Sequence, residues 1–536
     1  MPSHPGIARR PIVSEAPVAY LSEPGVTPGD EGQELGHHAA SGVLWLTAQK
    51  WVVRIAGLVT IAILTRFLSP ADFGIVAAAT TVLPFFYLIS DLGFATYIVQ
   101  ADAPDRRTLS TGFWFSTCAG LLLTGALLLA SPIFGILFSS TDVVPVLQVL
   151  SLTVILTAIS SVPTALLRRR MKFRALAGQG LVASLIAQVI AVAMALGGAG
   201  VWAIVGQALA SQLILTVLAS VAARWLPAMT FSWSEFTKMT SFGLKVLGIE
   251  FVGMCRAAVE AAIISSVLGL TAFGYLTIAR KLVQIVQDLT GSALLPVTTV
   301  AFARIRDSSE RLVAAYLKAV RMTYAVMSPP LVLLSVASPL IIPIVFGAGW
   351  DESFRVAQFL ALAGTVVVGA TLDNGLFYGL GQPGRWFVYA LLVDVMTVVT
   401  TAVAVQAGLI AVAVGFLIVA VAATVSRWFL VAKTLGTPAR PVARPFLFLI
   451  STVLVSGATG TVMMTATVEW PALVRILLVG LTILLVHAGL AWLLARPVFG
   501  DLRILLIRFS RGRPQPVATP TESGQTPTSR ERDGTL

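Results

Sequence analysis

Long apolar runs separated by short polar segments fill the chain from about residue 42 to residue 494. Each run has roughly 20 residues, the length that a helix needs to cross the hydrocarbon core of a bilayer. Continuous runs such as LLLTGALLLASPIFGILF lack the alternation expected of barrel strands. The pattern predicts an all-α polytopic membrane protein with about 14 transmembrane helices. They are expected at residues 42–65, 74–98, 110–130, 144–167, 175–196, 201–222, 240–267, 273–299, 314–337, 354–380, 386–406, 409–432, 446–465 and 472–494.

Two segments about 200 residues apart share one pattern, RFLSPADFGIVAAAT at 66–80 and SVLGLTAFGYLTIAR at 266–280. Each joins two apolar runs through a turn that ends in Phe-Gly. Further pairs follow at a similar offset, SPIFGILF with SPLIIPIVF and VLQVLSL with VAQFLAL. The offset predicts two pseudo-symmetric six-helix bundles plus two extra C-terminal helices. Because each copy has an even number of helices, the copies should be parallel repeats about an axis along the membrane normal.

The composition of the connecting and terminal segments completes the predicted organisation. The ends are rich in Pro, Gly, Ser and charged residues and cannot form a packed core. A basic amphipathic stretch follows the last apolar run and is expected to lie on the membrane surface. The predicted parts are a disordered cytoplasmic tail (1–40), an N-terminal six-helix bundle (41–223), a cytoplasmic linker (224–239), a C-terminal six-helix bundle (240–433), helices 13 and 14 (445–495), and an interfacial basic helix with a disordered tail (496–536).

Basic residues orient the predicted spans. If the N-terminus is cytoplasmic, nearly all Lys and Arg outside the spans fall on the cytoplasmic side, and the outer side holds only Arg66, Arg355 and Arg475. This is a strong positive-inside bias. It predicts that both termini are cytoplasmic, and it assigns the net charge of +12 to loops and anionic lipid rather than to nucleic acid.

Charged residues inside the spans are candidates for function, because a charge at mid-bilayer costs about 2.5–3.5 kcal/mol even on the lenient insertion scale. Arginine and lysine offer several donors to phosphate oxygens. We therefore predict a cationic lumen for an anionic headgroup such as phosphate or pyrophosphate. Snorkelling to lipid phosphates is an equal alternative for Lys50 and Lys245. The predicted lumen residues are Lys50, Arg54, Lys245, Arg256, Arg280 and Lys281.

Carboxylates within or near the same spans are candidates for ion coupling or gating, with H⁺ or Na⁺ as the coupling ion. Other interpretations stay open, because Arg256 and Glu260 can neutralise each other, and Asp91 and Asp373 can cap or pin helices. His487 is expected to be a packed polar residue. The predicted coupling or gating residues are Asp91, Glu250, Glu260, Asp288, Asp373 and Asp394.

Motifs for catalysis are not found in this sequence. It has no G-x-x-x-x-G-K-[ST] phosphate loop, no H-E-x-x-H and no G-x-S-x-G. Only four histidines are present, and three of them lie in the N-terminal tail. We therefore expect no enzyme activity, no resident metal and no cofactor.

Several local motifs stand out along the chain, namely LTRFLSPADFGIVAAAT, SDLGFATYIVQ, VPTALLRRRMKF, GAGVWAIVGQALASQ, LGLTAFGYLTIARKLVQ, LLPVTTVAFARI, FGAGWDESFRVAQFLALAG and GLGQPGRW. Together they resemble the Wzx-type polysaccharide-repeat-unit flippases, the colanic and teichuronic acid branch of the multidrug/oligosaccharidyl-lipid/polysaccharide exporter superfamily. The resemblance covers about residues 42–435. Asp91 in SDLG and Arg280 with Lys281 in IARKL stand at motif positions, whereas the usual tyrosine pair is replaced by Tyr275-Leu276.

The resemblance implies a flippase that carries a polyprenyl-(pyro)phosphate-linked oligosaccharide across a bacterial plasma membrane by alternating access. It also implies a polysaccharide polymerase and glycosyltransferases as partners in the same pathway. Alternatives are a flippase for the peptidoglycan lipid precursor, a multidrug/cation antiporter, a membrane-embedded transferase and a pure scaffold. The basic bias disfavours the antiporter, whose cavity should be acidic or apolar.

Overall fold

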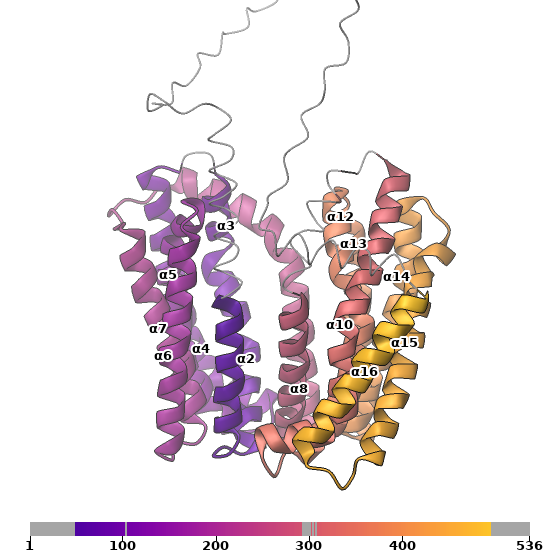
Figure 1. The fold of residues 1–536 in the computed structure, drawn as a ribbon. Helices are drawn as coiled ribbons and strands as arrows, with labels where there is room; N and C mark the ends of the chain where they lie inside the picture. The colour runs from indigo at the N-terminus through magenta and orange to yellow at the C-terminus, as the bar shows by residue number, and fades with distance from the viewer. Residues whose placement is uncertain (1–48, 102–103, 292–301, 303–304, 306–307, 495–536) are drawn as a thin grey trace, which may run out of the picture. The chain divides into compact units, whose positions relative to one another are not determined.

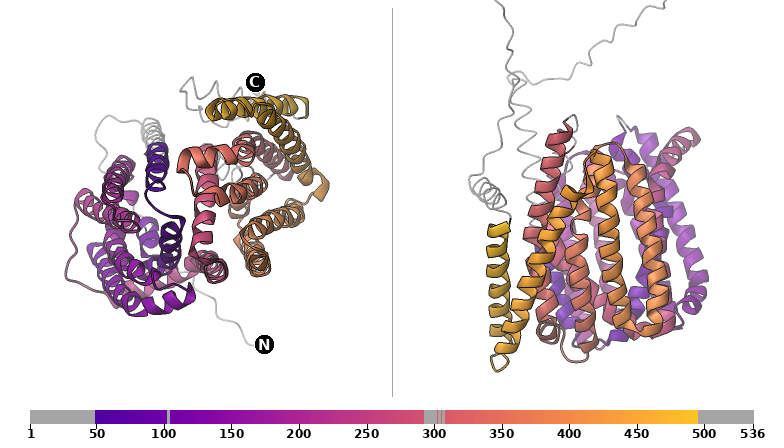
Figure 2. Two further views of the ribbon diagram at one scale, coloured as in Figure 1. Left: turned by 90° about the horizontal axis from the view of Figure 1, so that it is seen from below. Right: turned by 90° about the vertical axis from the view of Figure 1, so that its right-hand side faces the viewer.

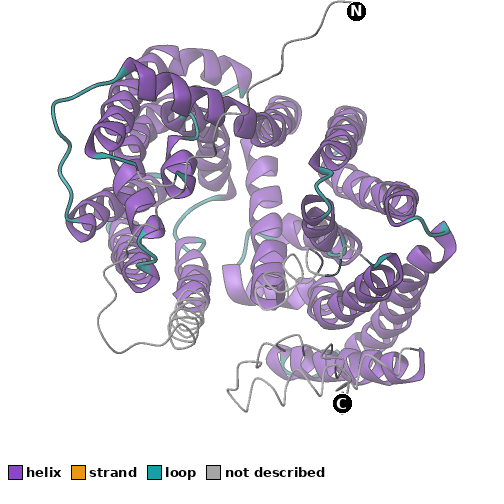
Figure 3. Cartoon of the chain, turned by 90° about the horizontal axis from the view of Figure 1, so that it is seen from above, coloured by secondary structure: helices purple, strands orange, loops and turns teal. Residues whose placement is uncertain are grey.

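The computed structural model describes residues 49–101, 104–291, 302, 305 and 308–494, without the side chains of residues 244–250 and 289–291. Over these residues the chain is helical apart from turns and short loops, and no strand is drawn in the described part (Figure 3). The predicted all-α fold is confirmed. Residues 49–64 form the first described helical segment. The helices that follow are α2 (Pro70–Asp91), α3 (Phe94–Gln100), α4 (Arg106–Leu137), α5 (Val143–Arg169), α6 (Phe173–Leu196), α7 (Trp202–Ala223), α8 (Trp233–Gly291), α10 (Ser309–Phe346), α11 (Asp351–Val367), α12 (Ala370–Gly379), α13 (Pro383–Ala404), η1 (Val405–Ala407), α14 (Leu409–Leu435), α15 (Ala439–Ala466) and α16 (Ala472–Leu494).

Twelve helical segments in the described part are long and apolar enough to cross a membrane, so the chain is a multi-span membrane protein. The predicted count of 14 is not confirmed. Two features account for the difference. The first predicted span extends into residues outside the described part, and residues 240–291 are counted within the single helix α8.

Helix α8 is a hairpin with two arms. Gly269 has φ 82° and ψ 167° inside it, a conformation that glycine adopts without a steric penalty. In a straight helix, residues 20 positions apart would be separated by about 30 Å. However, the guanidinium of Arg280 contacts the carboxylate of Glu260. The chain therefore reverses at Gly269, where the sequence predicts a turn between two spans.

The chain divides into two compact units. Unit 1 comprises residues 1–68 and 79–254, and unit 2 comprises residues 69–78 and 255–536. In unit 1, α5 packs against α4 and α7, and α6 packs against α7 (Figure 1). In unit 2, α10 packs against α11, α15 and α16, whereas α14 packs against α11 and α13. The paired helices α15 and α16 are visible at the C-terminal end of unit 2 (Figure 2).

The outer faces of the helices carry large exposed apolar side chains. On α4 these include Leu122, Leu129 and Ile136, and on α16 they include Leu477 and Leu485. Such faces are expected where lipid tails rather than water surround a helix. The backbone polar groups are already paired within the helix, so apolar side chains can face the lipid. The polar residues that remain inside the bundles are therefore the informative ones.

The repeated Phe-Gly segments contact each other inside unit 2. A Cβ atom added at Gly74 would lie 1.9 Å from the carbonyl oxygen of Leu270, and one added at Gly274 would lie 1.9 Å from that of Pro70. Glycine permits this backbone approach because it has no side chain. Gly74 corresponds to Gly274, and Pro70 to Leu270, in the 200-residue repeat. The two contacts are therefore related by a local pseudo-two-fold axis.

Three arginines in the motif VPTALLRRRMKF end α5, and two of them stabilise helix ends in unit 1. Arg169 donates to the carbonyl oxygens of Ile98 and Ala101 at the end of α3. Arg170 donates to the carbonyl oxygen of Ala223, the last residue of α7, at 2.7 Å. Cations at helix C-termini satisfy carbonyl groups and oppose the negative end of the helix dipole. These arginines therefore have a structural role.

Candidate functional site

An ion-pair cluster joins the two arms of α8 to α13 in unit 2. Arg256 and Glu260 are one helical turn apart and face the same side of the first arm. Nη1 of Arg256 lies 2.9 Å from Oε2 of Glu260, and Nε of Arg256 lies 2.9 Å from Oδ1 of Asp394 on α13. Arg280, on the second arm, contacts the other carboxylate oxygen of Glu260. We call these four residues the Glu260 cluster.

Burial differs within the Glu260 cluster. The carboxylate of Glu260 is buried, whereas Arg256, Arg280 and Asp394 are partly exposed. The guanidinium carbon of Arg280 also lies 4.9 Å from the ring centre of Phe416, a cation–π distance. One buried carboxylate thus positions two arginines, each of which has five N–H donors. The contact agrees with the alternative in which Glu260 neutralises Arg256, and Arg280 and Asp394 add two further charges. A lumen role for Arg256 stays a prediction.

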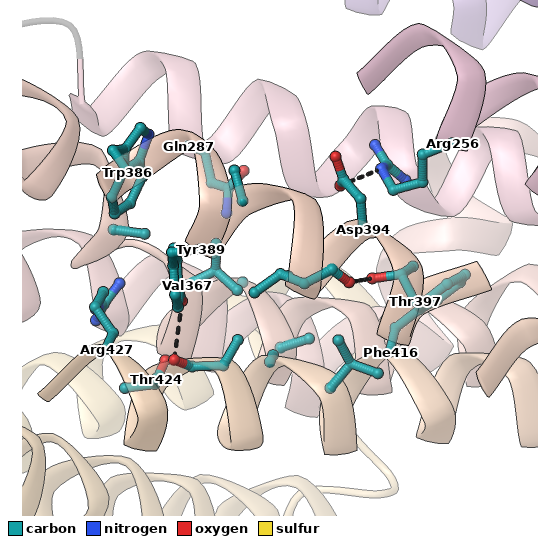
Figure 4. A pocket seen from close by; sticks show the side chains of 18 residues that line it. Arg256, Gln287, Val367, Trp386, Tyr389, Asp394, Thr397, Phe416, Thr424 and Arg427 are labelled. Carbon is teal, nitrogen blue, oxygen red and sulfur yellow. Dashed lines mark hydrogen bonds and ion pairs between the residues drawn. The ribbon is translucent and has the colours of Figure 1, made fainter. Parts of the chain in front are cut away.

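A cavity of about 440 Å³ lies beside this cluster in unit 2. Figure 4 shows Arg256 and Asp394 toward one end, and Trp386, Tyr389 and Arg427 toward the other. Most of the wall is apolar, with a few convergent polar groups, as is common in small-molecule sites. The lining residues are Arg256, Gln287, Ala363, Gly364, Val367, Ala370, Trp386, Tyr389, Ala390, Val393, Asp394, Thr397, Phe416, Val419, Ala420, Ala423, Thr424 and Arg427.

A second cluster lies at the Arg427 end of the cavity and joins α10, α12 and α14. Nε of Arg427 lies 2.9 Å from Oδ2 of Asp373. The hydroxyl of Tyr316 donates to Oδ1 of Asp373 at 2.6 Å, and Nη2 of Arg427 donates to the hydroxyl of Tyr324 at 3.3 Å. All four side chains are buried. We call them the Asp373 cluster, and its complete burial indicates that it holds the three helices together.

Sequence reasoning named Asp373 but missed Arg427, Tyr316 and Tyr324 as its partners. Arg427 lies within the predicted span 409–432, so the cost of burying a charge was a signal for it. The tyrosines gave no such signal, because a tyrosine in an apolar run is common. Only the packing of α10 against its neighbours places their hydroxyls beside the ion pair.

Asp91 lies in unit 1, at the break between α2 and α3. Its Oδ1 accepts a hydrogen bond from the hydroxyl of Ser161, and its Oδ2 accepts one from the backbone N–H of Ala95 at 3.3 Å. The break itself contains two residues with positive φ, Leu92 at 44° and Gly93 at 74°. These contacts match the interpretation that Asp91 pins the two helices. A role for it in ion coupling stays a prediction.

The other predicted site residues are dispersed. Lys50 and Arg54 lie on the helix at 49–64 in unit 1, with Lys50 exposed. Lys281 and Asp288 lie on the second arm of α8, near the Glu260 cluster in sequence. The side chains of Lys245 and Glu250 fall outside the described part. His487 is buried near the hydroxyl of Ser328, at 3.4 Å.

The fold is that of multi-span helical membrane proteins whose structures have been solved. It is similar to the lipid II flippase MurJ in an inward closed conformation, with a TM-score of 0.67 and 14% identity over 84% of this chain and 99% of that chain. It is also similar to an inward-facing multidrug resistance MATE transporter of the MOP superfamily, with a TM-score of 0.59 and 15% identity over 72% of this chain and 98% of that one.

The family described as "Polysaccharide biosynthesis protein" matches residues 63–355, which is more than half of the chain, and the chain belongs to this family. The chain is 27% identical to the succinoglycan biosynthesis transport protein ExoT of Rhizobium meliloti (strain 1021), over 63% of this chain and 69% of ExoT. It is 23% identical to the lipopolysaccharide biosynthesis protein WzxC of Escherichia coli (strain K12), over 79% of this chain and 88% of WzxC. It is also 23% identical to the teichuronic acid biosynthesis protein TuaB of Bacillus subtilis (strain 168), over 76% of this chain and 86% of TuaB. The predicted resemblance is confirmed.

Proposed function

We propose that the chain is a flippase that moves a polyprenyl-(pyro)phosphate-linked oligosaccharide repeat unit from the inner to the outer leaflet of a bacterial plasma membrane. Family membership supports this proposal, as do relatives whose names place them in succinoglycan, lipopolysaccharide and teichuronic acid biosynthesis. The fold shared with a lipid II flippase supports transport of a lipid-linked cargo. The protein would act by alternating access, as a transporter rather than an enzyme.

The observation that carries the proposal is the Glu260 cluster beside the cavity. Arg256 is partly exposed and is shared between a buried carboxylate and the partly exposed Asp394. A phosphate or pyrophosphate can form bidentate, charge-assisted hydrogen bonds with a guanidinium. We propose that the cargo phosphate replaces Asp394 on Arg256, while Glu260 keeps Arg256 and Arg280 in position.

This exchange offers a route for coupling to an ion gradient. Asp394 loses its cationic partner when phosphate occupies Arg256, so it becomes available to take up H⁺ or Na⁺. When the cargo leaves, Arg256 re-forms its ion pair and Asp394 releases the ion. The charges near the cavity would then stay balanced throughout the cycle, which reduces the cost of holding them in the membrane.

The setting of the proposed activity follows from the charge distribution. Positive-inside bias supports an orientation with both termini cytoplasmic, so the charged lipid would enter from the cytoplasmic leaflet. The polysaccharide polymerase and glycosyltransferases of the pathway would act before and after the flippase. A second candidate is a flippase for the peptidoglycan precursor, which the structural likeness to MurJ favours. The curated relatives favour polysaccharide repeat units.

A leaflet assay in proteoliposomes tests the proposal. Intact protein should translocate polyprenyl-pyrophosphate-linked glycans, and Arg256→Gln should reduce the rate by roughly tenfold or more, because a hydrogen bond to a charged group is worth about 1.5–3 kcal/mol. Arg385→Gln is the matched control, since Arg385 is an exposed arginine of α13 that bonds only to Gln382 within the described residues. Asp394→Asn should keep cargo binding and lose the dependence on an H⁺ or Na⁺ gradient. Equal rates for Arg256→Gln and Arg385→Gln would reject the site, and no translocation of any glycolipid would reject the function.

A further inference from the structure

The linker between α7 and α8 follows a fixed path over α4 in unit 1. It is the long loop at the edge of the molecule in Figure 3. Three hydrogen bonds hold its backbone to buried or half-buried side chains in the first turns of α4. The indole of Trp114 donates to the carbonyl oxygen of Ala228 at 2.8 Å, the N–H of Ala228 donates to Ser110, and the N–H of Ser232 donates to Thr111.

The outward side of this linker is apolar. Leu226 is 79% exposed, Met229 is 87% exposed and Trp233, the first residue of α8, is 74% exposed. Phe231 lies between them and is also exposed. Four large apolar side chains exposed close together would be unusual on a surface that faces water. Tryptophan and long apolar side chains are typical of the boundary between lipid headgroups and acyl chains.

A cationic hollow of about 520 Å³ lies beside this apolar surface. It is lined by Arg106 and Arg107, the first two residues of α4, and by residues 228–231 of the linker. Both arginines are exposed, and neither makes an ion pair with any residue in the described part of the chain. The positive end of the α4 dipole adds to their field.

Two carboxylates near the hollow already have partners. Asp105 accepts hydrogen bonds from the backbone N–H and the hydroxyl of Thr108, at 2.7 and 2.6 Å. Glu235 accepts from Lys238 at 2.7 Å and from the hydroxyl of Thr108 at 3.0 Å. Glu235 is thus neutralised by Lys238, whereas Asp105 keeps its charge as a helix cap and interacts electrostatically with Arg107. The two arginines remain the exposed guanidinium donors at the hollow.

We propose that this hollow binds the phosphate of an anionic phospholipid headgroup, with Leu226, Met229 and Trp233 inserted at the level of the upper acyl chains. The inference is independent of the proposed cargo. A guanidinium pair suits a phosphodiester oxygen, and the apolar rim suits the chains attached to it. The positive-inside pattern places this surface in the cytoplasmic leaflet. A soluble phosphate ion would contact only the two arginines and would not cover the apolar side chains. A protein partner would not need a phosphate group at the arginines.

Lipid binding to the full-length protein in neutral detergent tests the inference. Intact protein should bind phosphatidylglycerol more tightly than phosphatidylcholine in native mass spectrometry. Each basic residue contributes about a fivefold gain near an anionic surface, so Arg106→Gln with Arg107→Gln should weaken phosphatidylglycerol binding by roughly 20- to 30-fold. Arg385→Gln should leave it unchanged. An unchanged lipid preference in the double variant, or full competition by inorganic phosphate, would overturn the proposal.

A second measurement locates the linker without relying on the arginines. Met229→Cys, in a protein with Cys118→Ser and Cys255→Ser, can carry a spin label in proteoliposomes. A label at the headgroup–acyl boundary should be accessible to dissolved oxygen. It should be protected from a water-soluble nickel reagent. A label that is fully accessible to nickel in phosphatidylglycerol vesicles would overturn lipid insertion. Protection that appears only after a soluble protein is added would also overturn it.

Discussion

The two ion-pair clusters of unit 2 use the same groups in different surroundings. In the Glu260 cluster, Arg256 lies 2.9 Å from Asp394, and the two side chains are 32% and 23% exposed. In the Asp373 cluster, Arg427 lies 2.9 Å from Asp373, and the two side chains are 4% and 0% exposed. Both arginines line one cavity. The distance is equal, so the two pairs differ in exposure, and the exchange proposed above concerns the partly exposed pair.

Burial makes the Asp373 cluster structural. Tyr316 donates to Asp373 and Tyr324 accepts from Arg427, so displacing Asp373 would leave the buried hydroxyl of Tyr316 without its acceptor. In the proposed cycle, the buried Glu260 stays in place and the partly exposed Asp394 is the member that exchanges. The proposed cycle uses both kinds of contact, with the Asp373 cluster as the fixed end of the cavity and the Glu260 cluster as the end that responds to cargo.

The largest expected effect comes from breaking the buried pair. Arg427→Met should destabilise the protein by about 3–5 kcal/mol, because it leaves the carboxylate of Asp373 buried without its cation. The thermal unfolding midpoint in detergent and the amount of protein in the membrane measure this effect. Arg427→Met combined with Asp373→Leu should recover part of the loss. A single variant as stable as the parent would show that Asp373 is not held by this pair.

A smaller effect is expected from crowding the same cluster without removing a charge. A Cβ atom added at Gly369 would lie 2.5 Å from the hydroxyl oxygen of Tyr324 and 2.9 Å from Nη2 of Arg427. Gly369→Ala should therefore cost about 1–3 kcal/mol through overpacking, measured by the unfolding midpoint. Gly384→Ala is the control, since nothing lies within 4 Å of an added Cβ there. Equal midpoints for the two variants would mean that the cluster can shift freely.

The smallest effect belongs to two carboxylates outside the membrane spans, the exposed Asp105 and the partly exposed Glu235. The hydrogen bonds of Thr108 lower the pKa of Asp105, and the hydrogen bond from Lys238 lowers the pKa of Glu235. A lowered pKa in the folded state stabilises the fold at pH values above the unfolded-state pKa, and this stabilisation is lost as pH falls through the folded-state pKa.

The unfolding midpoint between pH 7 and pH 3 measures this contribution. Asp105→Asn and Glu235→Gln should each flatten the acid side of the profile slightly, below the ordinary carboxylate pKa of about 4. Their midpoints at pH 7 should be slightly below that of intact protein. A variant that steepens the acid loss would contradict the assignment of these carboxylates as stabilising when ionised.

Parts of the Glu260 cluster could be predicted from the sequence. Arg256 and Glu260 are four residues apart on a helix, so their contact follows from helix geometry alone. Asp394 is a candidate from the sequence because a charged side chain within a span costs free energy. Its pairing with Arg256 also requires α13 to lie beside α8. Arg280 reaches Glu260 only because α8 reverses at Gly269. The sequence contained the glycine, but not the distance between the two arms.

The linker over α4 was predicted as a plain cytoplasmic connection, and the structure adds its fixed path and its apolar side. No pattern in the sequence singles out Ser110, Thr111 and Trp114. In an apolar run their side chains have no identifiable partner until the linker passes over them. Backbone groups of a loop need partners, and which side chains provide them depends on where the loop lies.

The sequence by itself determined the helical class, the multi-span character and the family, because apolar run length and local motifs are properties of the chain alone. It also indicated some of the charged residues that lie inside the bundle, such as Glu260 and Asp373. Only the tertiary structure decided that Arg256 is shared with Asp394, that Arg427 is sealed against Asp373, and that Gly74 meets Gly274. These contacts join residues far apart in the chain, and their energies depend on burial and distance, which hydropathy and spacing do not specify.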